Sequence, residues 1–86
     1  MNKKTIEEVI KLILDFYKTS KVGETITEPF TTNDNLGLEY YLTHINNAIV
    51  VHEECDGLWT RALLIPINGE NGEEEMYDAL EWYFNN

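Results

Sequence analysis

The chain has 86 residues, 43% of them hydrophobic, and its 16 acidic and 6 basic side chains give a formal net charge of −10. This length predicts one domain with a modest core, and the apolar content excludes a disordered acidic tail. Binding to nucleic acid or to an anionic membrane needs Lys and Arg side chains, so the negative charge argues against both.

The charge is unevenly distributed along the chain. All five lysines lie in the first 21 residues, and Arg61 is the only basic residue after Lys21. Residues 22–86 contain 13 acids and one base, a net charge of −12. Self-repulsion of this kind opposes folding slightly. The asymmetry therefore indicates either a device for solubility or a surface for a basic protein partner.

The sequence also bears on the cell compartment. Cys55 is the single cysteine and has no partner for an internal disulfide, which is typical of a reducing compartment. The first residues lack the apolar run and cleavage site of a signal peptide, and no apolar stretch approaches the length of a membrane span. We expect a cytoplasmic protein.

The residue pattern predicts a helix near each end of the chain. Thr5 and Glu8 match a capping box, and apolar residues then recur every three or four positions, which predicts an amphipathic helix at about 6–20. Asn71 is a candidate cap for a second helix at about 73–84, whose acidic first turn suits the helix dipole. Its apolar stripe contains Met76, Ala79, Leu80, Tyr83 and Phe84.

Three strand-like runs lie between the helices, at 38–45, 48–55 and 58–67. Asn46-Asn47 and Asp56-Gly57 separate them, and both pairs suit two-residue type I′ turns. We therefore predict an antiparallel meander.

The segment 22–37 is ambiguous: it either contains a short edge strand around Thr25–Thr27 or forms a functional loop. The expected fold is α+β, in the order α-(β)-β-β-β-α. The sheet has three strands, or four if the segment supplies one, and both helices pack on one of its faces.

Two-residue turns fix the pairing of the predicted hairpins. Tyr41 then faces His52, and His52 faces Arg61 on the following strand. A four-residue loop at 54–57 would instead place His52 opposite Trp59, and we prefer the shorter turn because it separates a core face from a mixed face. The core face contains Leu38, Tyr40, Leu42, His44, Ile49, Val51, Glu53, Cys55, Leu58, Thr60, Ala62 and Leu64. The mixed face contains Glu39, Tyr41, Thr43, Ile45, Ala48, Val50, His52, Glu54, Trp59, Arg61, Leu63 and Ile65.

The last helix carries the first candidate site. Glu74, Asp78 and Glu81 are four and three residues apart and form one outward acidic stripe. Like charges at this spacing cost about 0.2–0.5 kcal/mol per pair, and no lysine follows to offset them. The functional interpretation is a surface that competes with nucleic acid for the basic groove of a partner. The alternative is a purely solubilising surface.

The mixed sheet face carries the second candidate site. Trp, Tyr and Arg are the residue types enriched at binding hot spots, and all three occur on this face. The candidate residues are Glu39, Tyr41, His52, Glu54, Trp59 and Arg61. If the helices cover the opposite face, this cluster is an exposed protein-binding patch. Otherwise a helix or a second copy of the chain covers it.

The sequence contains no catalytic or cofactor motif. A Gly-rich phosphate loop, a nucleophile elbow and an HExxH pair are all missing. His52 and Cys55 are soft metal ligands, but their spacing on a strand directs them to opposite faces. Glu53, on the core face, is expected to bond a neighbouring hydroxyl group. We therefore expect neither an enzyme nor a metal or cofactor site.

In size, charge and expected architecture the chain is similar to many phage- or plasmid-encoded inhibitors, including anti-restriction and anti-CRISPR proteins. This resemblance is one of kind, covers no motif and transfers no residue roles. We hypothesise a non-enzymatic inhibitor or adaptor of a basic nucleic-acid-handling protein such as a nuclease, acting as a partial DNA mimic. The alternative is a homodimeric structural or regulatory domain that buries its mixed sheet face.

Overall fold

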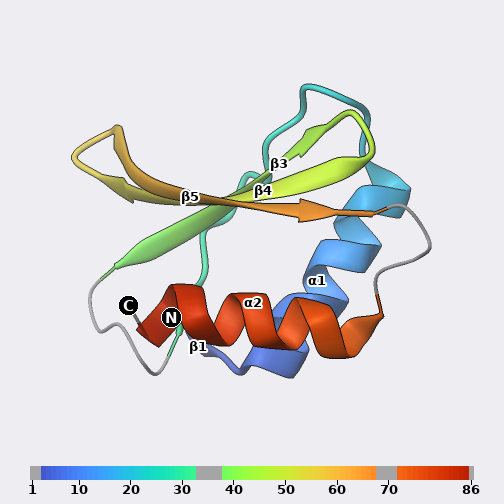
Figure 1. The fold of residues 1–86 in the computed structure, drawn as a ribbon. Helices are drawn as coiled ribbons and strands as arrows, with labels where there is room; N and C mark the ends of the chain where they lie inside the picture. The colour runs from blue at the N-terminus through green and yellow to red at the C-terminus, as the bar shows by residue number, and fades with distance from the viewer. Residues whose placement is uncertain (1–2, 33–37, 68–71, 86) are drawn as a thin grey trace.

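Two layers make up the fold, a three-stranded antiparallel sheet and a pair of helices that lie against one of its faces (Figure 1). The computed structural model describes residues 3–32, 38–67 and 72–85. The elements in chain order are β1 (Lys3–Lys4), α1 (Ile6–Thr19), β2 (Thr31–Thr32), β3 (Glu39–Ile45), β4 (Ala48–Cys55), β5 (Leu58–Pro66) and α2 (Glu73–Asn85). The predicted α+β class, with a helix near each end and a meander between them, is confirmed.

The predicted capping box begins α1. Thr5 Oγ1 accepts a hydrogen bond from the Glu8 backbone amide at 3.2 Å, and the Thr5 amide donates to Glu8 Oε1 at 2.9 Å. The helix ends at Thr19, and the amide and hydroxyl groups of its cap, Ser20, both donate to the Phe16 carbonyl oxygen. Its boundaries therefore follow from groups that satisfy its terminal amides and carbonyls. The proposed cap of the second helix, Asn71, lies outside the described residues.

The first hairpin has the predicted register, with Tyr41 opposite His52 and Ile45 opposite Ala48. In the turn that joins β4 to β5, Asp56 and Gly57 both have positive φ angles, of 53° and 82°, as a type I′ turn requires. In the turn between β3 and β4 only Asn47 does, at 55°. The type I′ prediction is therefore wrong for this first turn.

The predicted register of the second hairpin fails after its first pairs. Glu54 lies opposite Trp59, but Glu53 lies opposite Arg61. Thr60 is therefore the extra residue of a β-bulge. Beyond the bulge His52 pairs with Ala62, so its predicted pairing with Arg61 is wrong, as is the alternative pairing with Trp59.

The bulge reverses the two faces of β5. A slip of one residue sends every following side chain to the other face of a sheet. Ile65 is consequently 2% exposed against the helices, whereas Leu64, predicted in the core, is 54% exposed. Arg61 and Leu63 likewise turn toward the helix layer, and Ala62 turns outward. Leu58, near the turn, is also exposed.

Residues 23–30 run along the outer edge of β3 without forming a regular strand. The Ile26 amide donates to the Leu42 carbonyl at 2.8 Å, and Phe30 and Tyr40 exchange two backbone hydrogen bonds of 3.0 and 2.8 Å. Two isolated bridges therefore take the place of the fourth strand considered for this segment. The next residues, in β2, pair in parallel with β1, which the pattern did not indicate. Residues 33–37 lie outside the described part.

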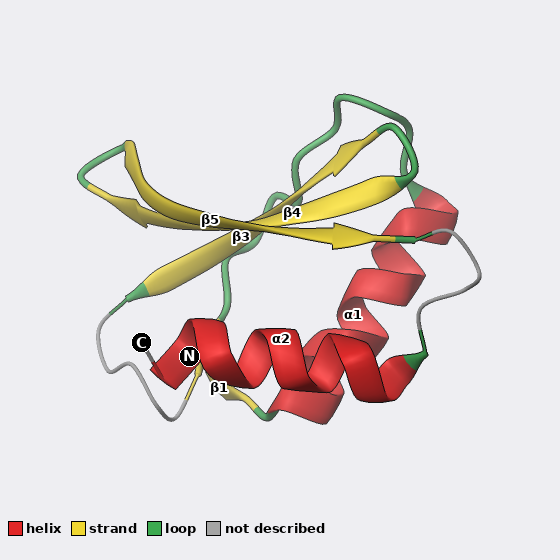
Figure 2. Cartoon of the chain, in the orientation of Figure 1, coloured by secondary structure: helices red, strands yellow, loops and turns green. Residues whose placement is uncertain are grey.

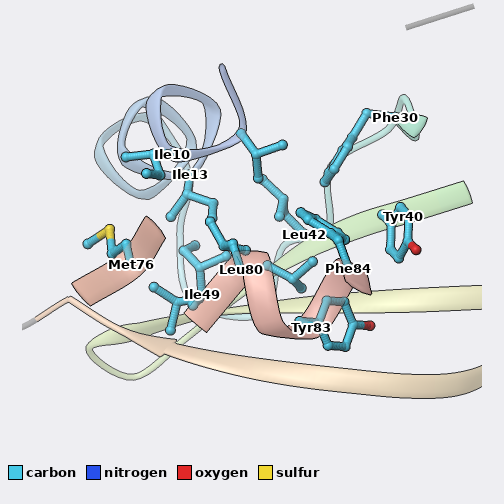
Figure 3. Close-up of a cluster of buried hydrophobic side chains, with 13 residues drawn as sticks. Ile10, Ile13, Phe30, Tyr40, Leu42, Ile49, Met76, Leu80, Tyr83 and Phe84 are labelled. Carbon is cyan, nitrogen blue, oxygen red and sulfur yellow. The ribbon is translucent and has the colours of Figure 1, made fainter. Parts of the chain in front are cut away.

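The core lies between the sheet and both helices (Figure 2). Figure 3 shows Ile13 of α1 and Leu80 of α2 directed toward Ile49 of the sheet. Burial of such a side chain contributes about 1.5–3 kcal/mol. The cluster contains Val9, Ile10, Ile13, Phe30, Tyr40, Leu42, Ile49, Val51, Ile65, Met76, Leu80, Tyr83 and Phe84. Because both helices pack on one side, neither α1 nor α2 covers the other face of the sheet (Figure 1).

Candidate functional site

The face of the sheet that is turned away from the helices carries the predicted aromatic patch. Alternation along the paired strands directs Tyr41, His52 and Trp59 to this face. Trp59 is 55% exposed and Leu64, on the same strand, is 54% exposed. Trp59 is therefore open to solvent on an isolated molecule, as the binding-patch interpretation requires, whereas Tyr41 is half-buried and His52 is buried.

Three aromatic rings form a stack across the three strands of this face. The ring centroids of His52 and Trp59 are 3.8 Å apart, with 21° between the planes. Those of Tyr41 and His52 are 5.8 Å apart, with 14° between the planes. His52 is only 1% exposed, because its neighbours cover it. The stack gives this face a rigid apolar centre.

A short polar chain holds the His52 ring in place. Its Nε2 atom lies 2.9 Å from Thr43 Oγ1, which lies 2.8 Å from Thr25 Oγ1 on the edge segment. Its Nδ1 atom lies 3.6 Å from Glu54 Oε1. Burial lowers the pKa of His52 and the Glu54 carboxylate opposes that shift only in part, so the imidazole is neutral at neutral pH.

The order hydroxyl, imidazole, carboxylate is also that of hydrolytic triads. Here, however, the His52 ring is sealed from solvent, and the Thr43 hydroxyl is engaged by a second hydroxyl. Neither ring nitrogen is open to a dissolved substrate. The arrangement therefore orients the aromatic stack. Thr25 and Thr43 were not among the predicted site residues. The sequence pattern places Thr43 on the mixed face, but it does not show that Thr25 of the edge segment lies beside it.

Arg61 does not belong to this face. One of its terminal nitrogens donates to the Tyr83 carbonyl oxygen at 2.7 Å and lies 3.3 Å from Glu53 Oε2. Its guanidinium carbon lies 4.4 Å from the centroid of the Tyr83 ring. The predicted position of Arg61 beside Trp59 on the mixed face is wrong, because the bulge at Thr60 turns its side chain to the helix side.

The polar cluster around Arg61 stabilises the contact between the sheet and α2. Thr60 donates a hydrogen bond of 2.7 Å to Glu53 Oε1, which confirms the expectation that Glu53 bonds a neighbouring hydroxyl group. The last turn of α2 contains no basic residue of its own, so Arg61 supplies positive charge where the helix dipole favours it. Burial and the nearby Glu53 carboxylate raise the pKa of Tyr83, which keeps its hydroxyl group protonated.

The acidic stripe lies on the opposite side of the molecule from the aromatic patch. Glu74, Asp78 and Glu81 are all exposed, whereas Met76 and Leu80 on the other side of α2 are buried in the core. Within residues 3–32, 38–67 and 72–85, the only ion pair that involves a Lys or Arg side chain joins Arg61 to Glu53. The stripe and the patch are therefore two separate surfaces: Tyr41, His52 and Trp59 lie together, but the stripe residues do not join them.

A shallow groove of about 270 Å³ lies along α1 beside the first residue of α2. Lys11 and Lys18 of α1 line it together with Glu73 of α2, so lysines lie near the first carboxylate of α2 but not along its outward stripe. In the described part of the chain, no group of three or more His, Cys, Asp or Glu side chains is placed to hold a metal ion. No helix in that part is long and apolar enough to cross a membrane.

Comparisons with protein-family models, with curated proteins and with solved structures give no match for this chain. Two surfaces therefore carry the functional argument: the acidic stripe of α2, and the aromatic patch on the open face of the sheet.

Proposed function

We propose that this protein is a non-enzymatic, cytoplasmic inhibitor or adaptor that binds a basic nucleic-acid-handling protein. The observation that carries the proposal is the stripe formed by Glu74, Asp78 and Glu81, which is exposed and makes no ion pair with a base among the described residues. Such a stripe weakens its own helix. The Lys or Arg side chains of a basic partner would relieve the repulsion between these carboxylates, and this relief would favour binding.

The spacing of the stripe supports partial mimicry of a DNA strand. From Glu74 to Glu81 there are seven helical rises, or about 10 Å. A DNA strand carries one phosphate per about 3.4 Å of axis, so it places about four charges over that length. The stripe places three. A groove built for phosphates would meet a similar charge density on one side of α2.

The internal position of Arg61 adds to this argument. It is the only basic residue after Lys21, and its half-buried side chain contacts Glu53 and Tyr83. The surface contributed by residues beyond α1 therefore has almost no positive charge. Such a surface steers a basic partner into contact, raises the association rate and repels nucleic acid.

The test is affinity capture from the native host with the full chain as bait, repeated at about 50 and 300 mM salt. Glu74→Gln, Asp78→Asn and Glu81→Gln together should abolish capture. The matched control changes Glu7→Gln, Asp15→Asn and Glu28→Gln, which removes the same charge from exposed positions elsewhere. Capture that is insensitive to salt, or that both triple variants weaken equally, would contradict the proposal.

One observation favours a second candidate, a homodimer. Trp59 and Leu64 expose more than half of their surface on the open sheet face, and a second copy would cover them. The net charge of −10 on each copy opposes this association. Sedimentation at tens of micromolar decides between a monomer, which would exclude the homodimer, and a dimer that Trp59→Ser dissociates.

A further inference from the structure

Two carboxylates and an indole form one row across the open face of the sheet. Glu39 of β3 lies directly opposite Glu54 of β4, and Glu54 lies directly opposite Trp59 of β5. Residues paired in this way have Cβ atoms about 4.5–5.5 Å apart and side chains on the same face. The three side chains therefore leave the sheet side by side.

The two carboxylates of the row repel each other. Like charges directly opposite on neighbouring strands are destabilising, and neither Glu39 nor Glu54 pairs with a Lys or Arg among the described residues. Glu39 is exposed, and the Glu54 side chain is 25% exposed. Solvent and any ligand can therefore reach both of them. A cation from outside the chain would relieve this repulsion.

The indole and the imidazole complete the site. Trp59 rests on His52 through one face of its ring, at 3.8 Å between centroids, yet remains 55% exposed, so the other face is open. His52 Nδ1 is buried, makes no hydrogen bond within the described residues, and lies 3.6 Å from Glu54 Oε1. The His52 ring thus packs against one face of the indole, and its Nδ1 atom faces the Glu54 carboxylate. An open indole face attracts a cation through its π-system, and the carboxylates at the paired positions of the row attract it through charge.

We propose that the row of Glu39, Glu54 and Trp59 binds the guanidinium group of an arginine on a basic protein partner. A guanidinium is planar and stacks on an indole, and it donates two parallel N–H bonds to a carboxylate. The ammonium group of a lysine is not planar and cannot donate two parallel bonds in this way. This inference rests on the proposed function and specifies the chemistry of the contact. It involves a surface separate from the α2 stripe.

The test uses N-acetyl-arginine N-methylamide, at up to tens of millimolar, as a probe of the ¹⁵N-labelled full chain. The two indole N–H signals report on Trp59 and Trp82, and Trp82→Phe assigns them. We expect the Trp59 signal to shift and saturate with the arginine compound, and to respond at least threefold more weakly to the matched lysine and citrulline compounds. Equal responses to lysine and arginine, or an equal shift of the Trp82 signal, would overturn the proposal.

Variants then locate the binding site. Glu39→Gln with Glu54→Gln keeps the shape of the row and should weaken the arginine response about tenfold. Glu39→Gln alone, at an exposed position, should weaken it about threefold. The triple variant of the α2 stripe should leave it unchanged. A response that survives the double variant would refute the site.

The two proposals can fail separately. If host capture depends on the stripe but Trp59 does not respond to arginine, only the guanidinium site is wrong. If Trp59 responds to arginine but the substitutions in the stripe leave capture unchanged, the proposed function is wrong.

Discussion

Replacement of Arg61 by Met tests whether this side chain stabilises the fold or serves to bind a partner protein. The change removes the guanidinium but keeps an aliphatic stem against Tyr83. It breaks the 2.7 Å hydrogen bond to the Tyr83 carbonyl oxygen, worth about 1 kcal/mol. The cation–π contact at 4.4 Å adds about 0.5 kcal/mol. The ion pair with buried Glu53 adds about 1 kcal/mol, discounted because the Arg61 side chain is 31% exposed.

The free energy of unfolding should therefore fall by about 2.5 kcal/mol, or about 10–20 °C in Tm for a domain of this size. Urea unfolding followed by tryptophan fluorescence measures it. Glu53→Gln combined with Arg61→Met should cost less than the sum of the single changes, because no buried carboxylate is then left unpaired. A loss below about 0.5 kcal/mol for Arg61→Met would refute the structural role and return Arg61 to the candidate binding residues.

Two further predictions concern the start of α1 and the pH. Thr5→Ala removes the acceptor for the Glu8 amide and should cost about 1 kcal/mol in urea unfolding; an unchanged midpoint would show that the capping box contributes nothing. Because burial lowers the pKa of His52, the unfolded chain takes up this proton at a higher pH than the folded chain. Stability should therefore be full above about pH 6.5 and fall below it, and His52→Gln should flatten that part of the profile. The lowered pKa of Glu8 acts only below about pH 4.5, so parallel profiles of the two proteins between pH 7 and 5 would contradict the His52 prediction.

The elements could be predicted because their signals are local. The capping box at Thr5, the periodicity of both helices and the turn at Asp56 each act within a few residues. Thr60 shows where local reasoning stops. A bulge is favoured by contacts across the sheet, here the hydrogen bond from Thr60 to Glu53 and the fit of Arg61 against Tyr83. Glu53 lies on the neighbouring strand and Tyr83 lies in α2, so the residues next to Thr60 in the sequence do not reveal these contacts.

The bulge at Thr60 accounts for most of the wrongly predicted side-chain positions in the candidate site. It removed Arg61 from the predicted patch and exposed Leu64 in place of Ile65. Tyr41, His52 and Trp59 come together as predicted, because their pairing is set before the bulge or by the short turn beside it. The position of the acidic stripe relative to the patch depends on how α2 crosses the sheet. Tertiary packing determines this, and the sequence pattern does not.

The separation of the two surfaces bears on what kind of binding protein this is. A standard interface buries about 800 Å² on each partner, about a seventh of the 5402 Å² that the chain exposes, so one interface leaves most of the surface free. A single basic protein that held both the α2 stripe and the Trp59 row would have to extend around the edge of the sheet. Two partners, one on each face, would need no such extension. If both proposals hold, an adaptor is therefore the simpler arrangement, and stripe and row variants should each abolish binding of a different protein. Loss of the same partner by either variant, with effects that do not add, would instead indicate one partner that surrounds the domain.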